Sequence, residues 1–80
     1  MSSICVVAFY HFARLDDYKD IQKPLLEKCL SENIMGTVLL AQEGINGTIS
    51  GSEKNITKML SYIRSDQRLC NLAYKKSYTR

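Results

Sequence analysis

The stretch Gly36-Thr37-Val38-Leu39-Leu40-Ala41-Gln42-Glu43-Gly44-Ile45-Asn46-Gly47-Thr48-Ile49-Ser50-Gly51 decides the fold of this 80-residue chain. The run Thr37–Ala41 is apolar and β-branched, as is typical of a strand. The pair Asn46-Gly47 tolerates the positive φ that a tight antiparallel turn requires, and Thr48–Ser50 supplies a returning strand. We therefore predict a hairpin whose turn lies within residues 43–47, with permissive φ angles at Gly44 and Gly47.

Upstream of this hairpin, Ile4–Phe12 is apolar on both alternating sets of positions, which predicts a central strand with a neighbour on each side. An amphipathic helix should follow, capped by Asp16 or Asp17, with apolar residues at Ile21, Leu25, Leu26, Cys29 and Leu30. Pro24 removes a backbone donor inside this pattern, so we expect a kink or restart near Lys23. Asn33 and Gly36 mark the exit from the helix.

Downstream of the hairpin, apolar residues recur at helical spacing at Ile56, Met59, Leu60 and Ile63. Ser50 with Glu53 could form a capping box there, or Ser52 could be the cap, and the helix should end near Ser65-Asp66. Leu72–Tyr78 then reads as a short fourth strand with Tyr74, Lys76 and Tyr78 on one side.

The resulting order is β-α-β-β-α-β, which predicts an α+β, ferredoxin-like sandwich with two helices on one face of a four-stranded antiparallel sheet. The whole chain, residues 1–80, should form this single domain, and the other face of the sheet should stay open. With 45% apolar and 24% charged residues, the composition is that of a folded domain, and no apolar run reaches membrane-spanning length.

The charge is divided unevenly along the chain. Residues 54–80 contain seven Lys or Arg and one acidic residue, whereas residues 1–53 contain four basic and seven acidic residues. A cationic surface attracts nucleic-acid phosphates, and the candidates for such contacts are Arg64, Arg68, Lys75 and Lys76. Surface lysines often only keep a domain hydrated, so the alternative is that these basic residues bind no nucleic acid.

Catalytic signals in the sequence are weak. His11 is the single histidine, and Cys5, Cys29 and Cys70 are too widely spaced to indicate a disulfide framework or a zinc site. Cys5 and Cys29 fit apolar patterns, whereas Cys70 should be partly exposed. Arg14 follows the first strand, where an acylphosphatase holds phosphate, but its loop lacks glycine. Tyr10, Phe12 or Tyr74 could stack nucleotide bases, although aromatic residues on a first strand are more often core.

Four segments together resemble a known family: Val6–Phe12, Pro24–Leu26, Gly36–Gly51 and Leu72–Ser77. They are similar to the N-terminal domain of the rhodanese-like tRNA uridine hydroxylases. Ala41–Thr48 is the most specific part of this resemblance.

Since no membrane-spanning run is present and no basic segment precedes the first apolar stretch, we expect a cytoplasmic protein. The resemblance implies a longer protein, in which this domain precedes a rhodanese domain that carries the catalytic cysteine. That family hydroxylates the wobble uridine of tRNA in an oxygen-dependent reaction. No residue of this chain inherits the catalytic role, and no cofactor is expected in this domain. We expect an accessory domain that helps to position tRNA, with Glu43, Gly44, Asn46 and Gly47 shaping a turn or domain junction. The alternative is a structural domain that packs on the rhodanese domain and never contacts RNA.

Overall fold

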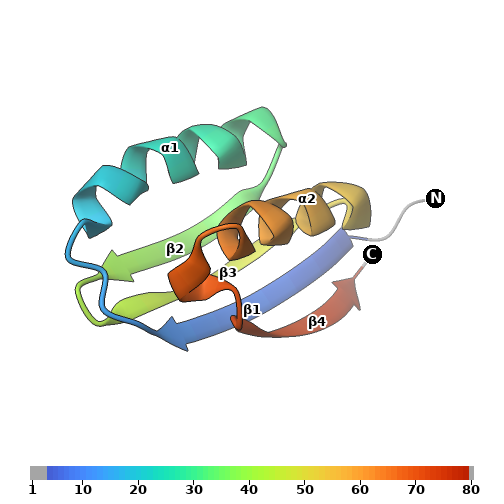
Figure 1. The fold of residues 1–80 in the computed structure, drawn as a ribbon. Coiled ribbons are helices and arrows are strands. Elements are labelled where there is room, and N and C mark those ends of the chain that lie inside the picture. The colour runs from blue at the N-terminus through green and yellow to red at the C-terminus, as the bar shows by residue number, and fades with distance from the viewer. Residues whose placement is uncertain (1–3, 80) are drawn as a thin grey trace.

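A computed structural model describes residues 4–79 and shows four strands and two helices in the predicted order (Figure 1). The elements are β1 (Ile4–Phe12), α1 (Tyr18–Ser31), β2 (Met35–Ala41), β3 (Gly44–Gly51), α2 (Glu53–Arg64), a short 3₁₀ turn η1 (Gln67–Leu69) and β4 (Ala73–Thr79). The strands form one antiparallel sheet in the order β2-β3-β1-β4, so β1 is central, as its sequence predicts. The ferredoxin-like prediction is confirmed.

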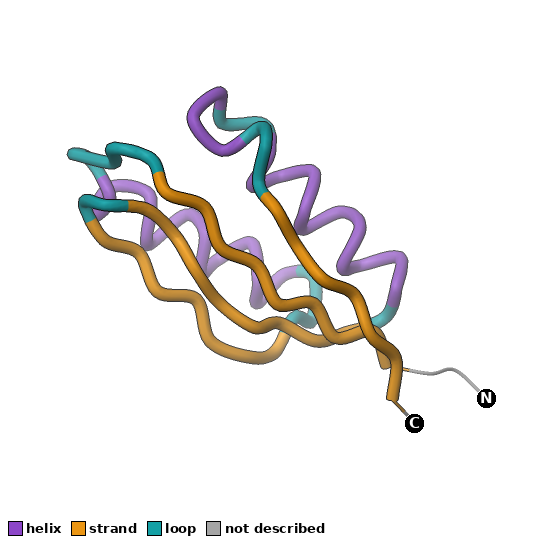
Figure 2. The backbone as a smooth tube through the Cα atoms, turned by 90° about the horizontal axis from the view of Figure 1, so that it is seen from below, coloured by secondary structure: helices purple, strands orange, loops and turns teal. Residues whose placement is uncertain are grey.

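The two faces of the sheet differ because side chains alternate along each strand. Both helices cover one face, and Figure 2 shows the four strands in front of them when the molecule is seen from below. The covered face carries the apolar core: Cys5, Val7 and Phe9 of β1 with Ile45 and Ile49 of β3. The opposite face is left without a covering layer by the described residues.

The two helices contribute unequally to this core. Ile56, Met59, Leu60 and Ile63 of α2 are all buried at the predicted helical spacing, whereas α1 buries only Leu25. Ser52 is the N-cap of α2 and accepts a hydrogen bond from the Asn55 amide at 3.2 Å, so the second of the two predicted caps is formed.

The hairpin forms, but its turn does not lie where the sequence predicts it. Strand β2 ends at Ala41 and β3 begins at Gly44, so the connection is Gln42-Glu43. Asn46 and Gly47 lie inside β3, opposite Leu39 and Val38 of β2. Gly44 has the expected positive φ of 151°, but Gly47 has no positive φ. Its missing Cβ instead leaves room for the Phe9 ring and for the backbone of β2.

Helix α1 also departs from its prediction. It runs from Tyr18 to Ser31 without restarting, although Pro24 lies inside it. Pro24 and Asp20 are both exposed, so water can bond the carbonyl that lacks an amide partner. Asp17 is the N-cap residue, but its side chain makes no capping hydrogen bond and contacts Arg68 instead.

The three cysteines are all free: Cys5 is buried, Cys29 half-buried and Cys70 exposed. Within residues 4–79, neither helix combines the length and the apolar character needed to cross a bilayer.

Candidate nucleic-acid interface

The uncovered face of the sheet carries a group of exposed side chains, which we call the open face. The register between neighbouring strands aligns the residues of all four strands in rows across this face. The open face includes Ala8, Tyr10, Phe12, Met35, Thr37, Leu39, Asn46, Thr48 and Lys75. Lys75 is the only charged strand residue on this face within residues 4–79, so the strands present an almost uncharged surface of polar and apolar side chains, with Glu43 of the β2–β3 turn at its end.

Two aromatic rings stand on this face at the end of β1. Tyr10 is 60% exposed and Phe12 is 82% exposed, although large aromatic side chains are usually buried. Their ring centroids lie 6.1 Å apart in an edge-to-face arrangement. The tendency of first-strand aromatics to be core residues therefore holds for Phe9 but not for Tyr10 or Phe12.

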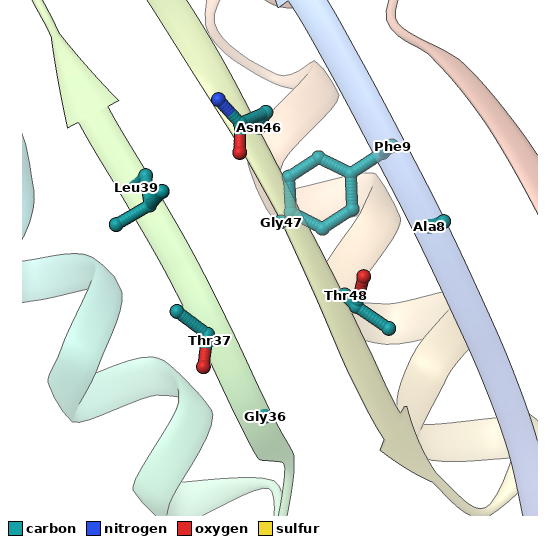
Figure 3. Close-up of a pocket in the computed structure, with 8 residues that line it drawn as sticks. All are labelled: Ala8, Phe9, Gly36, Thr37, Leu39, Asn46, Gly47 and Thr48. Atoms are coloured by element: carbon teal, nitrogen blue, oxygen red, sulfur yellow. The ribbon is translucent and has the colours of Figure 1, made fainter.

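Two shallow depressions lie on this face; they share Leu39 and Asn46, and the two rings line one of them. One, of about 530 Å³, is lined by Thr37 and Leu39 of β2 and by Asn46 and Thr48 of β3 (Figure 3). The other, of about 420 Å³, lies between Tyr10, Phe12 and Leu39. This face would suit an extended polar ligand with stacking rings, because it combines flat aromatic rings with exposed amide and hydroxyl groups in shallow depressions.

Lys75 lies on β4 opposite Ala8, two residues along from the pair Tyr10–Ala73. It therefore lies on the open face near the aromatic pair. Within the described residues it takes part in none of the ion pairs. Its charge is thus available to a phosphate.

Arg68 is held by two carboxylates on the other side of the molecule. Its guanidinium donates to Asp17 Oδ1 at 2.6 Å and to Asp66 Oδ2 at 2.8 Å. These bonds to Arg68 are the main reason that the pKa values of Asp17 and Asp66 lie below their ordinary values, and they raise the pKa of Arg68. The arrangement ties η1 to the start of α1.

Arg64 and Lys76 lie along the helix-facing side of β4. Arg64 donates from Nε to the Cys70 carbonyl at 3.1 Å and its guanidinium lies 5.9 Å from the Tyr74 ring centroid. Lys76 Nζ is 3.5 Å from Glu53 Oε2, which also accepts a 2.6 Å hydrogen bond from Tyr78. The four basic candidates therefore do not form one patch: Lys75 is on the open face, and the other three have partners elsewhere.

The Gln42-Glu43 turn docks on the loop between β1 and α1. The amides of Ala13 and Leu15 donate to the carbonyls of Glu43 and Gln42 at 3.0 and 2.8 Å. These amides therefore point at carbonyl groups and not toward an anion, and Arg14 forms an ion pair with Asp16. The loop consequently lacks the ring of free amides that a phosphate cradle needs. Glu43 and Gly44 shape this end of the molecule.

Other reactive groups in the described part of the chain are scattered. No three His, Cys, Asp or Glu side chains among residues 4–79 lie close enough together to hold a metal ion. Burial raises the pKa of the Cys29 thiol, whose sulfur lies 3.9 Å from that of Met59. Desolvation of this kind opposes thiolate formation, so the thiol is a poor nucleophile.

The sequence alone does not show that Thr37, Leu39, Asn46 and Thr48 share one surface. The signal was present as a period-two alternation, but it required the register between strands. The misplaced turn shifted that register, because Asn46 was expected in the turn and lies in a strand.

Comparison with known proteins agrees with this architecture. Residues 4–80 match the model of the UPF0176 acylphosphatase like domain. A tRNA uridine(34) hydroxylase from Ehrlichia ruminantium (strain Welgevonden) is 48% identical over 75 residues, which cover 94% of this chain and 28% of that protein. The chain thus corresponds to little more than a quarter of the length of this relative. Because the match spans the β-α-β-β-α-β unit from β1 to the end of β4, the chain belongs to the family of UPF0176 acylphosphatase-like domains.

Proposed function

We propose that this chain is a non-catalytic accessory domain of a tRNA uridine hydroxylase and that it helps to position tRNA for 5-hydroxylation of the wobble uridine. The 48% identical relative is a tRNA uridine(34) hydroxylase, which supports tRNA as the substrate. In this proposal the reaction itself takes place in a rhodanese domain with a reactive cysteine, the second domain that the family resemblance implies. No cofactor is needed by this domain in the proposal.

The observation that carries the proposal is the exposure of Tyr10 and Phe12 beside the shallow depressions of the open face. Wobble uridine lies in a single-stranded loop, and proteins recognise unpaired nucleotides by stacking them on aromatic rings. Asn46 offers a hydrogen-bonding amide beside the rings, and Thr37 and Thr48 offer hydroxyl groups in the adjoining depression. Unpaired bases of the tRNA would thus rest on the sheet, as they do on other open β-sheets that bind RNA.

Within the basic set, Lys75 is the first candidate for a phosphate contact because it shares the open face and has no ion-pair partner among residues 4–79. Arg64 and Lys76 rank below it, because both lie on the helix-facing side of β4 and have partners there. Arg68 ranks last, since two carboxylates already neutralise it.

The test is the binding of an unmodified tRNA transcript to the purified chain, followed by fluorescence anisotropy over a series of salt concentrations. Lys75→Ala should weaken binding and reduce the slope of log K against log salt by about one unit, as for one lost phosphate contact. Lys76→Ala is a matched control at the adjacent position on the opposite face, and it should change the slope less because Glu53 neutralises Lys76. Equal slopes for wild type and Lys75→Ala would remove Lys75 from the interface.

A second function is favoured by one observation. An almost uncharged surface with exposed Met35, Leu39 and Phe12 has the composition of the centre of a protein interface. The open face would then pack against the rhodanese domain without RNA contact. Absence of tRNA binding by the folded chain at low salt, where charge attraction is strongest, would support this function over the first.

A further inference from the structure

The two edge strands of the sheet are protected very differently. Strand β4 carries Lys75 and Lys76, and its helix-facing side is tied to α2 through Tyr78 and Glu53. Charged residues on an edge strand, lysine above all, discourage pairing with another chain. Strand β2 has the sequence Met-Gly-Thr-Val-Leu-Leu-Ala, with no charge and no proline over seven residues. It lies at the opposite edge of the sheet, with β3 beside it on one side only.

Apolar side chains flank the β2 edge on both faces of the sheet. On the open face, Met35 is 74% exposed and Leu39 is 58% exposed. On the other face, Leu26 and Leu30 of α1 are also largely exposed and border a groove of about 330 Å³ between α1 and β2. No charged residue lines this groove. A free strand edge between two apolar strips is suited to accept another strand with apolar residues on both faces.

Strand β2 itself has that character. Two β2 strands can pair antiparallel so that one residue lies opposite its own copy. Because side chains alternate with period two, each residue then lies opposite a residue that points to the same face of the sheet. Full overlap centres the pair on Val38, with Met35 opposite Ala41 and Thr37 opposite Leu39 of the second strand. The absence of charge on β2 removes like-charge repulsion between identical edges.

We propose that β2 is a self-association edge, through which a second copy of this chain joins the sheet by antiparallel β2–β2 pairing. The contact is isologous: it occupies the β2 edge of each copy, so association through β2 stops at a dimer. The two sheets become one sheet, and α1 of each copy brings Leu26 and Leu30 to the seam on the helix side. The open faces of both copies then lie on the same side. This inference does not depend on RNA binding.

Sedimentation equilibrium of the purified chain over a range of concentrations tests the proposal. The wild type should be a reversible dimer. Thr37→Lys with Leu39→Lys places a lysine opposite a lysine at two points of the seam, and we expect dimerisation to weaken by at least roughly tenfold. Ala73→Lys with Ser77→Lys adds the same charge to the open face of β4 and should leave the dimer unchanged. A wild type that stays monomeric, or open-ended aggregation, would overturn the proposal.

A second measurement keeps the test decisive if the lysine variant unfolds. Val38→Cys, in a background of Cys29→Ala and Cys70→Ser, places two thiols opposite each other, within the Cα separation that a disulfide spans. Oxidised glutathione should convert the folded variant to a covalent dimer, whereas Ser77→Cys in the same background should stay largely monomeric. Equal cross-linking at positions 38 and 77 would contradict the β2 seam.

Discussion

At the residue scale, two small polar clusters tie the last third of the chain to the helices. Arg68 bridges Asp66 to Asp17, and Tyr78 with Lys76 engages Glu53 at the start of α2. The tyrosine hydroxyl is the main cause of the lowered pKa of Glu53, with Lys76 second, and the same hydrogen bond raises the pKa of Tyr78 to about 12. These contacts are exposed, so breaking them should change the pKa values of the groups involved more clearly than the stability of the fold.

Replacing Tyr78 with Phe should raise the pKa of Glu53 toward its ordinary value, because the donor to its carboxylate is removed. In the wild type, the lowered pKa means that the Glu53 contribution to stability is present above pH 4.5 and is lost as the pH falls below it. The Tyr78 contribution is present below pH 10 and is lost as the pH rises through about 12. NMR titration of the Glu53 carboxyl carbon measures the first shift, and Tyr10→Phe on the open face is the control. An unchanged Glu53 pKa in Tyr78→Phe would show that the hydrogen bond is not formed.

Gly44 is a glycine that the hairpin requires. Its φ is 151°, and a Cβ there would collide with the His11 carbonyl oxygen, a backbone atom that cannot move aside. We therefore expect Gly44→Ala to lower the free energy of unfolding by about 2 kcal/mol or more. Gly51→Ala is the matched control, because its Cβ would first meet the movable end of the Ile34 side chain at 3.1 Å. Urea unfolding of both variants measures the difference, and equal stability would refute this account of the turn.

At the scale of elements, the sequence predicts the order and type of every strand and helix because the apolar periods are clear. It fails where a local preference competes with a tertiary contact. Asn46-Gly47 favours a turn locally, but Gly47 is needed in a strand, where its Cβ would lie 3.1 Å from the Phe9 ring. Asp17 favours a capping bond, but Arg68, 51 residues away, takes its carboxylate. The local sequence around Gly47 and Asp17 does not show that Phe9 and Arg68 are their partners.

The helices should differ in their contribution to stability. Ile56 in α2 is fully buried, whereas Ile21 in α1 is half-buried. Ile56→Ala leaves a cavity in the core and should cost about 2–5 kcal/mol, as large-to-small core substitutions do. Ile21→Ala should cost clearly less. Chemical denaturation of the two variants compares them directly, and a larger loss for Ile21→Ala would mean that α1 packs more tightly than its burial indicates.

At the scale of the whole molecule, the fold separates its surfaces by chemistry. The helices and the β1–α1 loop carry several ion pairs, whereas the open face is almost uncharged and has two exposed rings. The sequence predicts the uncovered face but not its composition, because that depends on which residues of four strands share a side. This surface is the centre of the proposed tRNA contact.

The most direct test of that contact is an NMR titration of the ¹⁵N-labelled chain with the unmodified anticodon stem-loop of a tRNA. We expect chemical-shift changes to concentrate on the open face, at Ala8, Tyr10, Phe12, Thr48 and Lys75, and to spare Arg68 and the exposed side of α2. Tyr10→Ala with Phe12→Ala should weaken binding by roughly tenfold or more, as for a lost stacking contact, whereas Tyr74→Ala on the other side of the sheet should not. Shift changes confined to the helices, or no shift changes up to the highest RNA concentration of the titration, would contradict the proposed contact.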